Sequence, residues 1–546
     1  MRRLLVPALL VAMGSTGVQA AGGAIVRGTP GPDQLRGTAF ADELYGRGGA
    51  DRLEGRAGDD LLDGGPGRDR LFGGAGADWF ASSGDERSDT VRCGPGLDIV
   101  NADLSDPVAA DCDVLSRRLS RDVDRVSEAN HETQVEPDSH AFGSTIVAVF
   151  QSGRFVEGGA ATIGFSTSRN GGRTWRSGLL PALSVYSKPP GPSSSISDPV
   201  VAYDAAHRWW LAASLSTGGV LISRSRNGVS WNRPVTAAAD PTGEIDKEWI
   251  TCDSWPRSRF RGRCYLSYMN FGTNLLETRR SVDGGRTWSR PVSFDAGRPA
   301  AVVNGVQPVV RPNGDLVLVF TVFAAGPFAG EIAATRSTDG GETFAALSRV
   351  APLQPADPIW MRAPSFTSVD VDAAGVVYVA WSDGCFTDEC TAHIVLARSP
   401  DGINWNPPTS VPISPSNRPP DHFLPGLAVD PATAGGSARV ALLYHSIGPP
   451  VFCDPTFGCS AIDVGLITSR DGGRTWGRAQ RLNVVSMSPF WMAETSLGRM
   501  LGDYVSVSWL RGRPVPVYSL ATAPTGRLFR QAIFAGTRLP LTTARR

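Results

Sequence analysis

The chain has 546 residues, of which 53 are basic and 53 acidic, so its formal net charge is zero. This length predicts more than one domain, and the neutral balance disfavours nucleic acid as a partner because phosphate binding needs a basic field. The 62 glycines and 41 prolines favour turns over long helices. After the first 20 residues, no stretch approaches the roughly 20 apolar residues of a membrane span.

Residues 1–20 have the pattern of a secretory signal peptide. Arg2 and Arg3 precede an apolar run from Leu4 to Met13, and Val18-Gln19-Ala20 offers a small-residue cleavage site. The run is too short to cross a bilayer. We therefore expect a secreted, extracellular protein without a membrane span.

A nine-residue repeat occupies residues 28–81. Each unit has a glycine, an aspartate five positions later and an apolar residue two positions after the aspartate. The apolar residues would stack inside a parallel β-solenoid whose tight corners use the glycines. The aspartates would then line the turns, where like charges repel unless a cation lies between them, and hard oxygen ligands select calcium. The alternative is an acidic, glycine-rich linker that does not fold.

The repeat resembles the hemolysin-type (RTX) calcium-binding repeat, whose consensus is GGxGxDxUx. The segment Gly73-Gly74-Ala75-Gly76-Ala77-Asp78-Trp79-Phe80 matches it well. The resemblance implies that calcium is bound and that turn carbonyls complete each site. The carboxylate ligands that it implies are Asp33, Asp42, Asp51, Asp60, Asp69 and Asp78.

The eight cysteines fall into four pairs that are close in sequence, which favours local disulfides in an oxidising compartment. Zinc is the weaker alternative because the chain has no CxxC pair. Residues 82–115 are interpreted as a disulfide-closed cap on the solenoid, and residues 116–132 as a linker. The expected pairs are Cys93 with Cys112, Cys252 with Cys264, Cys385 with Cys390, and Cys453 with Cys459.

A second repeat fills residues 133–546. Six short segments of the type SxDxGxTW recur, with their first serines 56 to 70 residues apart. In this pattern the Ser and Asp side chains bond nearby amides, the glycines take positive φ, and the Trp packs between neighbouring units. The segments are Ser168–Trp175, Ser225–Trp231, Ser281–Trp288, Ser337–Phe344, Ser399–Trp405 and Ser469–Trp476.

These segments resemble the Asp-box, or BNR repeat, and short strands lie between them. Three strands, a box turn and a fourth strand make one antiparallel blade, which predicts an all-β protein with a β-propeller after the solenoid. Six boxes predict six blades. The strands after the last box either complete the first blade or form a seventh, unboxed one.

From roughly Glu136 to the C-terminus the chain resembles the sialidase fold. In that family the active site lies on the face opposite the box turns, where this chain places a charge-rich rim that includes Asp198, Asp246, Lys247 and Asp503. The resemblance implies an arginine cluster for a sugar carboxylate, a tyrosine nucleophile with a glutamate partner, and an acid/base aspartate. The residues assigned to these roles are Arg154, Arg362 and Arg499, Tyr504 with Glu248, and Asp383.

The sequence also departs from that family. Its early Phe/Tyr-Arg-Ile-Pro motif is missing, so Arg154 is assigned from topology alone. Two functions therefore stay open: an exo-α-sialidase-type glycoside hydrolase that acts on an anionic glycan, and a non-catalytic extracellular propeller that binds a glycan or a cell-surface protein. A purely structural role is a third.

The zero net charge is a sum over two unlike parts. Residues 21–115 carry nine basic and 18 acidic side chains, whereas residues 116–546 have a net charge of +7. An acidic solenoid favours cations, and an arginine-rich propeller favours an anionic sugar.

Overall fold

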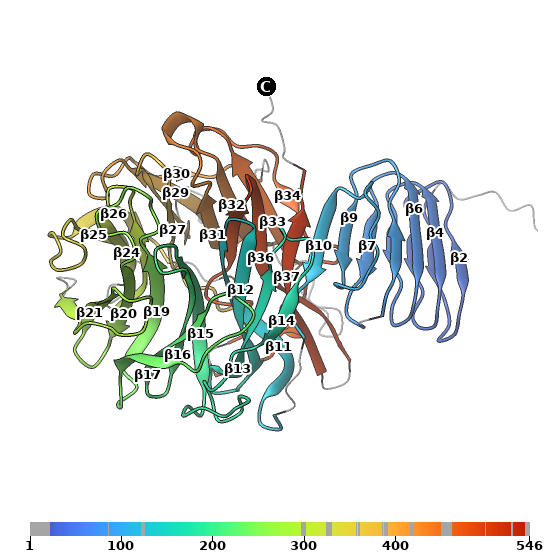
Figure 1. Cartoon of the computed structure of the whole chain (residues 1–546). Helices are drawn as coiled ribbons and strands as arrows, with labels where there is room; N and C mark the ends of the chain where they lie inside the picture. Colours follow the sequence, from blue (N-terminus) through green and yellow to red (C-terminus); the bar gives the residue numbers. More distant parts are fainter. Residues whose placement is uncertain are drawn as a thin grey trace, which may run out of the picture.

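The structure is a computed structural model that describes residues 22–85, 87–121, 126–295, 302–323, 330–355, 358, 361–384, 386, 391–414, 420–448, 461–496, 498–525 and 528–540. Figure 1 shows a narrow solenoid beside a broad propeller, and the predicted all-β fold is confirmed. The expected signal peptide lies outside the described residues.

The solenoid is built from two parallel sheets that enclose one column of apolar side chains. Each nine-residue unit contributes one short strand, and successive units alternate between the two sheets. Leu44, Leu53, Leu62, Leu71 and Phe80 are fully buried in that column. The strands of one sheet are β1 (Ile25–Arg27), β3 (Glu43–Tyr45), β5 (Leu61–Asp63), β7 (Trp79–Ser82) and β9 (Ile99–Ala102), and those of the other are β2 (Gln34–Arg36), β4 (Arg52–Ala57), β6 (Arg70–Ala75) and β8 (Thr90–Arg92).

The described part of the propeller contains seven four-stranded antiparallel blades, one more than the number of boxes. In each of the six boxed blades the four strands follow one another in the chain, and residues of the first strand line the central channel. The first three of these blades are β11 (Asn130–Phe142), β12 (Thr145–Arg154), β13 (Ala160–Ser168) and β14 (Arg176–Leu179); β15 (Ile196–Asp204), β16 (Trp209–Ser216), β17 (Gly219–Ser225) and β18 (Val235–Ala239); and β19 (Ile245–Cys252), β20 (Cys264–Asn270), β21 (Leu275–Ser281) and β22 (Val292–Phe294). The next three are β23 (Val302–Val310), β24 (Leu316–Phe323), β25 (Gly330–Ser337) and β26 (Ser348–Leu353); β27 (Ser368–Val371), β28 (Val377–Asp383), β29 (His393–Ser399) and β30 (Thr409–Ser410); and β31 (Asp421–Val429), β32 (Val440–Ile447), β33 (Ile462–Ser469) and β34 (Gln480–Arg481).

The Asp-box turns join the third and fourth strands, as predicted. In the third box, Ser281 Oγ accepts the amide of Gly285 at 2.9 Å, and Asp283 Oδ1 accepts the amide of Thr287 at 3.0 Å. Gly284 and Gly285 have φ of 73° and 75°, which only glycine adopts without strain. These side-chain bonds close the turn. Because each box joins the third and fourth strands of its blade, all six boxes lie on one face of the propeller.

The seventh blade takes its strands from both ends of the chain. Its three inner strands are β35 (Ser506–Leu510), β36 (Arg513–Thr525) and β37 (Leu528–Arg538), and its outer strand is β10 (Val114–Arg118). β10 pairs antiparallel with β37 on one side and parallel with β9 of the solenoid on the other. One strand therefore closes the propeller ring and joins it to the solenoid (Figure 1).

The segment interpreted as a cap, residues 82–115, contains β8 and β9, which extend the two solenoid sheets, and β10 begins inside it. The described residues contain two short 3₁₀ helices, η1 (Gly435–Ser437) and η2 (Pro489–Trp491), and neither these nor any other described segment forms a helix suited to crossing a membrane.

Two of the four predicted disulfides are confirmed. Cys93 is bonded to Cys112 at the propeller end of the solenoid, and Cys252 is bonded to Cys264 between β19 and β20. The other four cysteines lie outside the described residues, so their pairing stays a prediction. These cysteines are Cys385 and Cys390, which were expected to form one bond, and Cys453 and Cys459, which were expected to form the other.

Candidate functional site

Charged residues meet at the channel mouth, where five of the described inner strands, β11, β15, β19, β23 and β31, are bulged at equivalent positions. The pairing of β11, β15 and β19 shifts register at each bulge. Glu136, Asp198 and Lys247 occupy the bulges with φ of 52°, 46° and 52°. The left-handed conformation costs a non-glycine residue on the order of 1–3 kcal/mol and is concentrated at functional sites. This mouth is opposite the Asp-box turns.

Lys247 lies at the centre of a buried ion cluster. Its Nζ is 2.5 Å from Asp198 Oδ1, 3.2 Å from Asp503 Oδ2 and 3.6 Å from Glu136 Oε1. Burial alone would lower the pKa of Lys247, but the surrounding carboxylates raise it well above its usual value. The ammonium also lies 4.8 Å from the centre of the Tyr504 ring, so one cation holds three blades and an aromatic ring together.

The carboxyl groups in this cluster have opposite pKa shifts. Burial raises the pKa of Glu136 to about 7, although Lys247 opposes that change. Burial also acts on Asp503, but Lys247 and Arg362 lower its pKa to about 2. The same cluster therefore raises the pKa of one carboxyl group and lowers that of its neighbour.

Two of the three arginines assigned from the sequence come to this mouth. Arg362 makes a bidentate pair with Asp503, with Nε–Oδ1 at 2.9 Å and Nη2–Oδ2 at 2.6 Å. Arg154, at the end of β12, is only 2% exposed, and its guanidinium forms no hydrogen bond or ion pair with another described residue. Burial lowers the pKa of Arg154, while nearby Glu136 and Asp503 oppose this.

The third arginine, Arg499, has a different environment. Its Nη2 pairs with Glu494 Oε2 at 2.6 Å, and its backbone carbonyl accepts the amide of Arg362. Asp383 lies at the end of β28 and accepts a hydrogen bond from Trp381 Nε1 at 3.2 Å. The contacts described for Arg499 and Asp383 do not connect their side chains with the Lys247 cluster.

Tyr504 and Glu248 are close to the cluster, and both are buried. The Tyr504 hydroxyl donates to the carbonyl of Pro199 at 3.0 Å, and its ring meets Trp249 edge-on at 5.2 Å. Burial, reinforced by Glu136, raises the pKa of Tyr504 well above its usual value. Burial also raises the pKa of Glu248, and neither of its carboxyl oxygens has a hydrogen-bond partner among the described residues. These surroundings oppose the phenolate that a nucleophilic role requires.

We therefore expect Tyr504→Phe to act on stability and leave any ligand binding unchanged. The variant removes one buried hydrogen bond, which contributes about 0.5–1.5 kcal/mol. Thermal unfolding and glycan binding should be measured beside Tyr186→Phe, a half-buried tyrosine elsewhere in the propeller. Loss of a measured hydrolytic activity in the folded Tyr504→Phe variant alone would contradict this expectation and restore the nucleophile.

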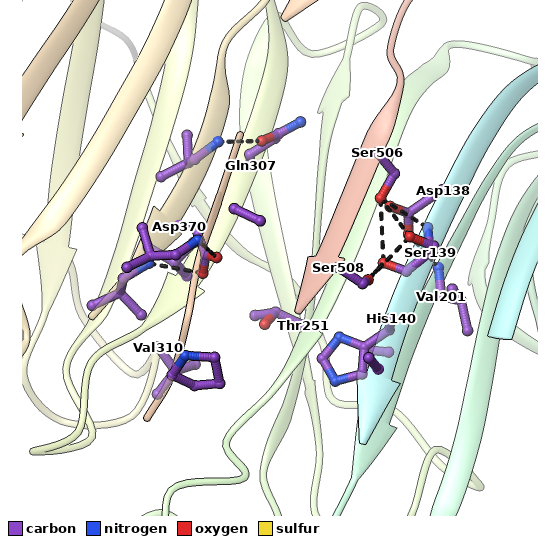
Figure 2. A pocket seen from close by; sticks show the side chains of 18 of the residues that line it. Asp138, Ser139, His140, Val201, Thr251, Gln307, Val310, Asp370, Ser506 and Ser508 are labelled. Atoms are coloured by element: carbon purple, nitrogen blue, oxygen red, sulfur yellow. Dashed lines mark hydrogen bonds between the residues drawn. The ribbon is translucent and has the colours of Figure 1, made fainter. Parts of the chain in front are cut away.

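Below the ion cluster the channel widens into a cavity of about 460 Å³. Figure 2 shows Ser139, Ser506 and Ser508 linked by hydrogen bonds on one wall, with Asp138 beside them and Asp370 on the opposite side. Asp138 Oδ2 accepts the amide of Val201 in the next blade at 2.8 Å. These polar groups tie neighbouring inner strands together. Trp249 lines the cavity and contacts Tyr504, so the cavity begins directly beneath the cluster.

The solenoid aspartates form two ladders, one along each row of turns. Asp51 Oδ1 accepts the amide of Asp33 at 2.8 Å, and Asp60 Oδ1 accepts that of Asp42 at 2.8 Å, each 18 residues away. The second carboxylate oxygens of four of the six predicted ligands are buried and lack a hydrogen-bond partner among the described residues. These four are Asp51, Asp60, Asp69 and Asp78.

The space beside these oxygens suits a cation with oxygen ligands. A Cβ atom on Gly46 would lie 2.5 Å from both Asp51 Oδ2 and the carbonyl oxygen of Gly64, so the glycine keeps the pocket open. The described residues contain no group of three or more His, Cys, Asp or Glu side chains that could hold a metal. The turns of these four aspartates instead each offer one free carboxylate oxygen with backbone carbonyls, a donor set that suits calcium. A bound calcium ion would supply the missing positive charge.

The first two predicted ligands differ from the other four. The Asp33 and Asp42 Oδ2 atoms accept the amides of Thr29 and Thr38. These threonines occupy the position of the second glycine in the repeat consensus. Their hydroxyl groups also donate hydrogen bonds to the same aspartates. Asp33 and Asp42 are therefore already engaged by their own turns.

A comparison with known protein families identifies the repeat of the solenoid. Residues 27–62, 45–80 and 54–89 match the RTX calcium-binding nonapeptide repeat family. No curated protein matches the chain.

Three of the solved structures that are similar to this chain cover most of it. A protein of unknown function from Dyadobacter fermentans is 17% identical, with 64% of this chain and 99% of that chain covered and a TM-score of 0.40. A Hadza microbial sialidase is 16% identical, with 77% and 68% covered and a TM-score of 0.39. A family PL25 ulvan lyase is 11% identical, with 76% and 97% covered and a TM-score of 0.46. The activities in these names belong to those proteins, whereas residues 27–89 of this chain carry RTX calcium-binding repeats.

Proposed function

We propose that the chain is an extracellular, calcium-binding propeller that recognises an anionic glycan at the channel mouth opposite the Asp-box turns. The observation that carries this proposal is the buried Arg154 guanidinium, which has no ion pair among the described residues. A buried charge without a partner is costly, and a ligand carboxylate would supply that partner in bidentate form.

The surroundings of Arg154 favour a single carboxylate over a polyanion. Arg362 and Lys247 add positive charge, but Asp198, Asp503 and Asp246 lie in the same cluster. A phosphodiester chain would meet these carboxylates and be repelled. An acidic sugar carries one carboxylate and several hydroxyl groups, and hydroxyl groups donate well to carboxylate oxygens.

A glycoside hydrolase is the second candidate, and the pKa difference between Glu136 and Asp503 favours it. Glu136, with a pKa of about 7, would hold the proton that a leaving glycosidic oxygen needs. In this proposal Glu136 takes the acid role that the sequence assigned to Asp383. The buried Tyr504 is left out of the chemistry.

Binding and hydrolysis can be separated with two variants. We expect Arg154→Gln to weaken binding of a carboxylate-bearing glycan by about 10- to 100-fold, since a charge-assisted contact contributes about 1.5–3 kcal/mol. Binding is measured on a glycan array and then by calorimetry, with the carboxyl-reduced glycan as the ligand control. Arg173→Gln, an exposed arginine in the first box, is the protein control.

Equal binding by wild type and Arg154→Gln would overturn the proposed site. Equal affinity of the wild type for the glycan and for its carboxyl-reduced form would overturn it as well. Release of a fluorophore from a sialoside by wild type, lost in Glu136→Gln while binding persists, would establish the hydrolase. Binding without any release would establish the non-catalytic propeller.

A further inference from the structure

Residues 93–100 form a divergent repeat unit beyond the residues that match the RTX family. The segment Cys93-Gly94-Pro95-Gly96-Leu97-Asp98-Ile99-Val100 keeps the second glycine, the fourth-position glycine, the aspartate and the apolar residue of the consensus. Cysteine replaces the first glycine, and the unit follows residues 73–80 by 20 positions, where earlier units on the same row are 18 apart.

The backbone of this segment repeats the preceding turn on its row. Gly94 and Gly96 have φ of 103° and 159°, as Gly74 and Gly76 have φ of 119° and 140°. The amide of Gly74 donates to the Cys93 carbonyl at 2.9 Å, so the two turns stack. β9 continues the sheet in parallel register with β7. The segment is therefore a full rung of the solenoid.

The aspartate ladder also continues into this rung. Asp98 Oδ1 accepts the amide of Asp78 at 2.9 Å, the same contact that Asp78 Oδ1 makes with the amide of Asp60. Asp78 and Asp98 are both 0% exposed, and the Oδ2 atom of each lacks a hydrogen-bond partner among the described residues. A Cβ atom on Gly73 would lie 2.7 Å from the Cys93 carbonyl oxygen, which borders the same space.

We propose that a further calcium ion binds between turns 73–78 and 93–98, held by carboxylate oxygens of Asp78 and Asp98 and by turn carbonyls. Two buried carboxylates without a counter-charge need a cation, and oxygen donors from carboxylates and carbonyls select calcium. Cys93 stands at the position of the missing first glycine and is bonded to Cys112.

This ion would act directly on the strand that closes the propeller. The carbonyl oxygen of Asp98 accepts the amide of Val114 at 2.9 Å, and Val114 is the first residue of β10. Fixing Asp98 therefore fixes the start of the outer strand of blade seven. Calcium binding at this site would therefore couple calcium loading of the solenoid to closure of the propeller ring.

Native mass spectrometry of the full-length protein in calcium tests the site through ion number. We expect Asp98→Asn to bind one calcium ion fewer than wild type. Asp59→Asn is the matched control, because Asp59 is an exposed solenoid aspartate outside the ladder whose Oδ1 accepts the amide of Ala77. It should keep the wild-type ion number. An unchanged number in folded Asp98→Asn would overturn the proposal.

Wild-type crystals grown in calcium provide a second test that does not depend on the variant folding. A long-wavelength anomalous difference map should show a peak between Asp78 and Asp98 in addition to those along the earlier turns. A map whose peaks end before this pair of turns would overturn the proposal.

Discussion

Removal of calcium from the folded protein is expected to loosen blade seven of the propeller together with the solenoid. The buried aspartate ladders lose their counter-charge, and the solenoid sheet that ends in β9 is the neighbour of β10. At a free calcium concentration of about 100 times Kd, each ion stabilises the folded state by about 2.7 kcal/mol. Loss of two ions alone should lower the Tm on the order of 10 °C.

Hydrogen–deuterium exchange with and without chelator locates this effect. We expect β10 and β37 to lose protection along with the solenoid strands, while β16, β20 and β24 on distant blades keep theirs as an internal reference. Magnesium should not restore the protection, because it requires a smaller octahedral site. Full protection of β10 and β37 after the solenoid has unfolded would show that the seventh blade closes without it.

Lys247→Met is expected to be the most destabilising single substitution in the propeller. It removes the cation that separates Asp198, Asp503 and Glu136 and leaves their charges buried. Removing one partner of a buried ion pair costs about 3–5 kcal/mol. The midpoint of guanidinium unfolding, followed by tryptophan fluorescence, measures the loss. Lys188→Met is the matched control, since Lys188 is exposed and is the only other lysine in the sequence.

The pH dependence of this variant distinguishes electrostatics from packing. Without the ammonium, Asp503 should have a folded-state pKa above its unfolded value, as Glu136 already does with a pKa of about 7. Such groups favour the folded state below the unfolded pKa and lose this contribution as the pH rises through the folded pKa. The stability difference from wild type should therefore widen from pH 5 to pH 8. A difference that is constant over this range would assign the loss to packing.

Local sequence patterns predicted most of the fold because their causes are local. The box at Ser281–Trp288 closes its turn through its own Ser, Asp and Gly residues, and the solenoid places one apolar residue of each repeat unit in its core. The seventh blade could not be counted, because β10 has only five residues and its partner β37 lies more than 400 positions away. Nothing near residue 114 signals that pairing.

The candidate site was predicted only in part. Topology placed Arg154 and Arg362 at one channel mouth, where the structure also has them. Burial and partners decide chemistry, and these raise the pKa of Tyr504 and pair Arg499 with Glu494. The central role of Lys247 was missed, although the sequence held a signal. Only two of 53 basic residues are lysines. A compact ammonium can face three separate carboxylates, whereas a planar guanidinium favours one or two in its own plane.

The shared strand β10 also determines when the molecule can finish folding. The Thr537 hydroxyl donates to the carbonyl of Leu115 across a separation of 422 residues. The pairing of β10 with β37 therefore needs nearly the whole chain. Contacts of such long range form slowly, because a large loop must be closed before they contribute. Until then the solenoid presents β10 as an open strand edge, which is a template for pairing with other chains. A chain that ends before β37 should therefore aggregate through β10 even when its first six blades are intact.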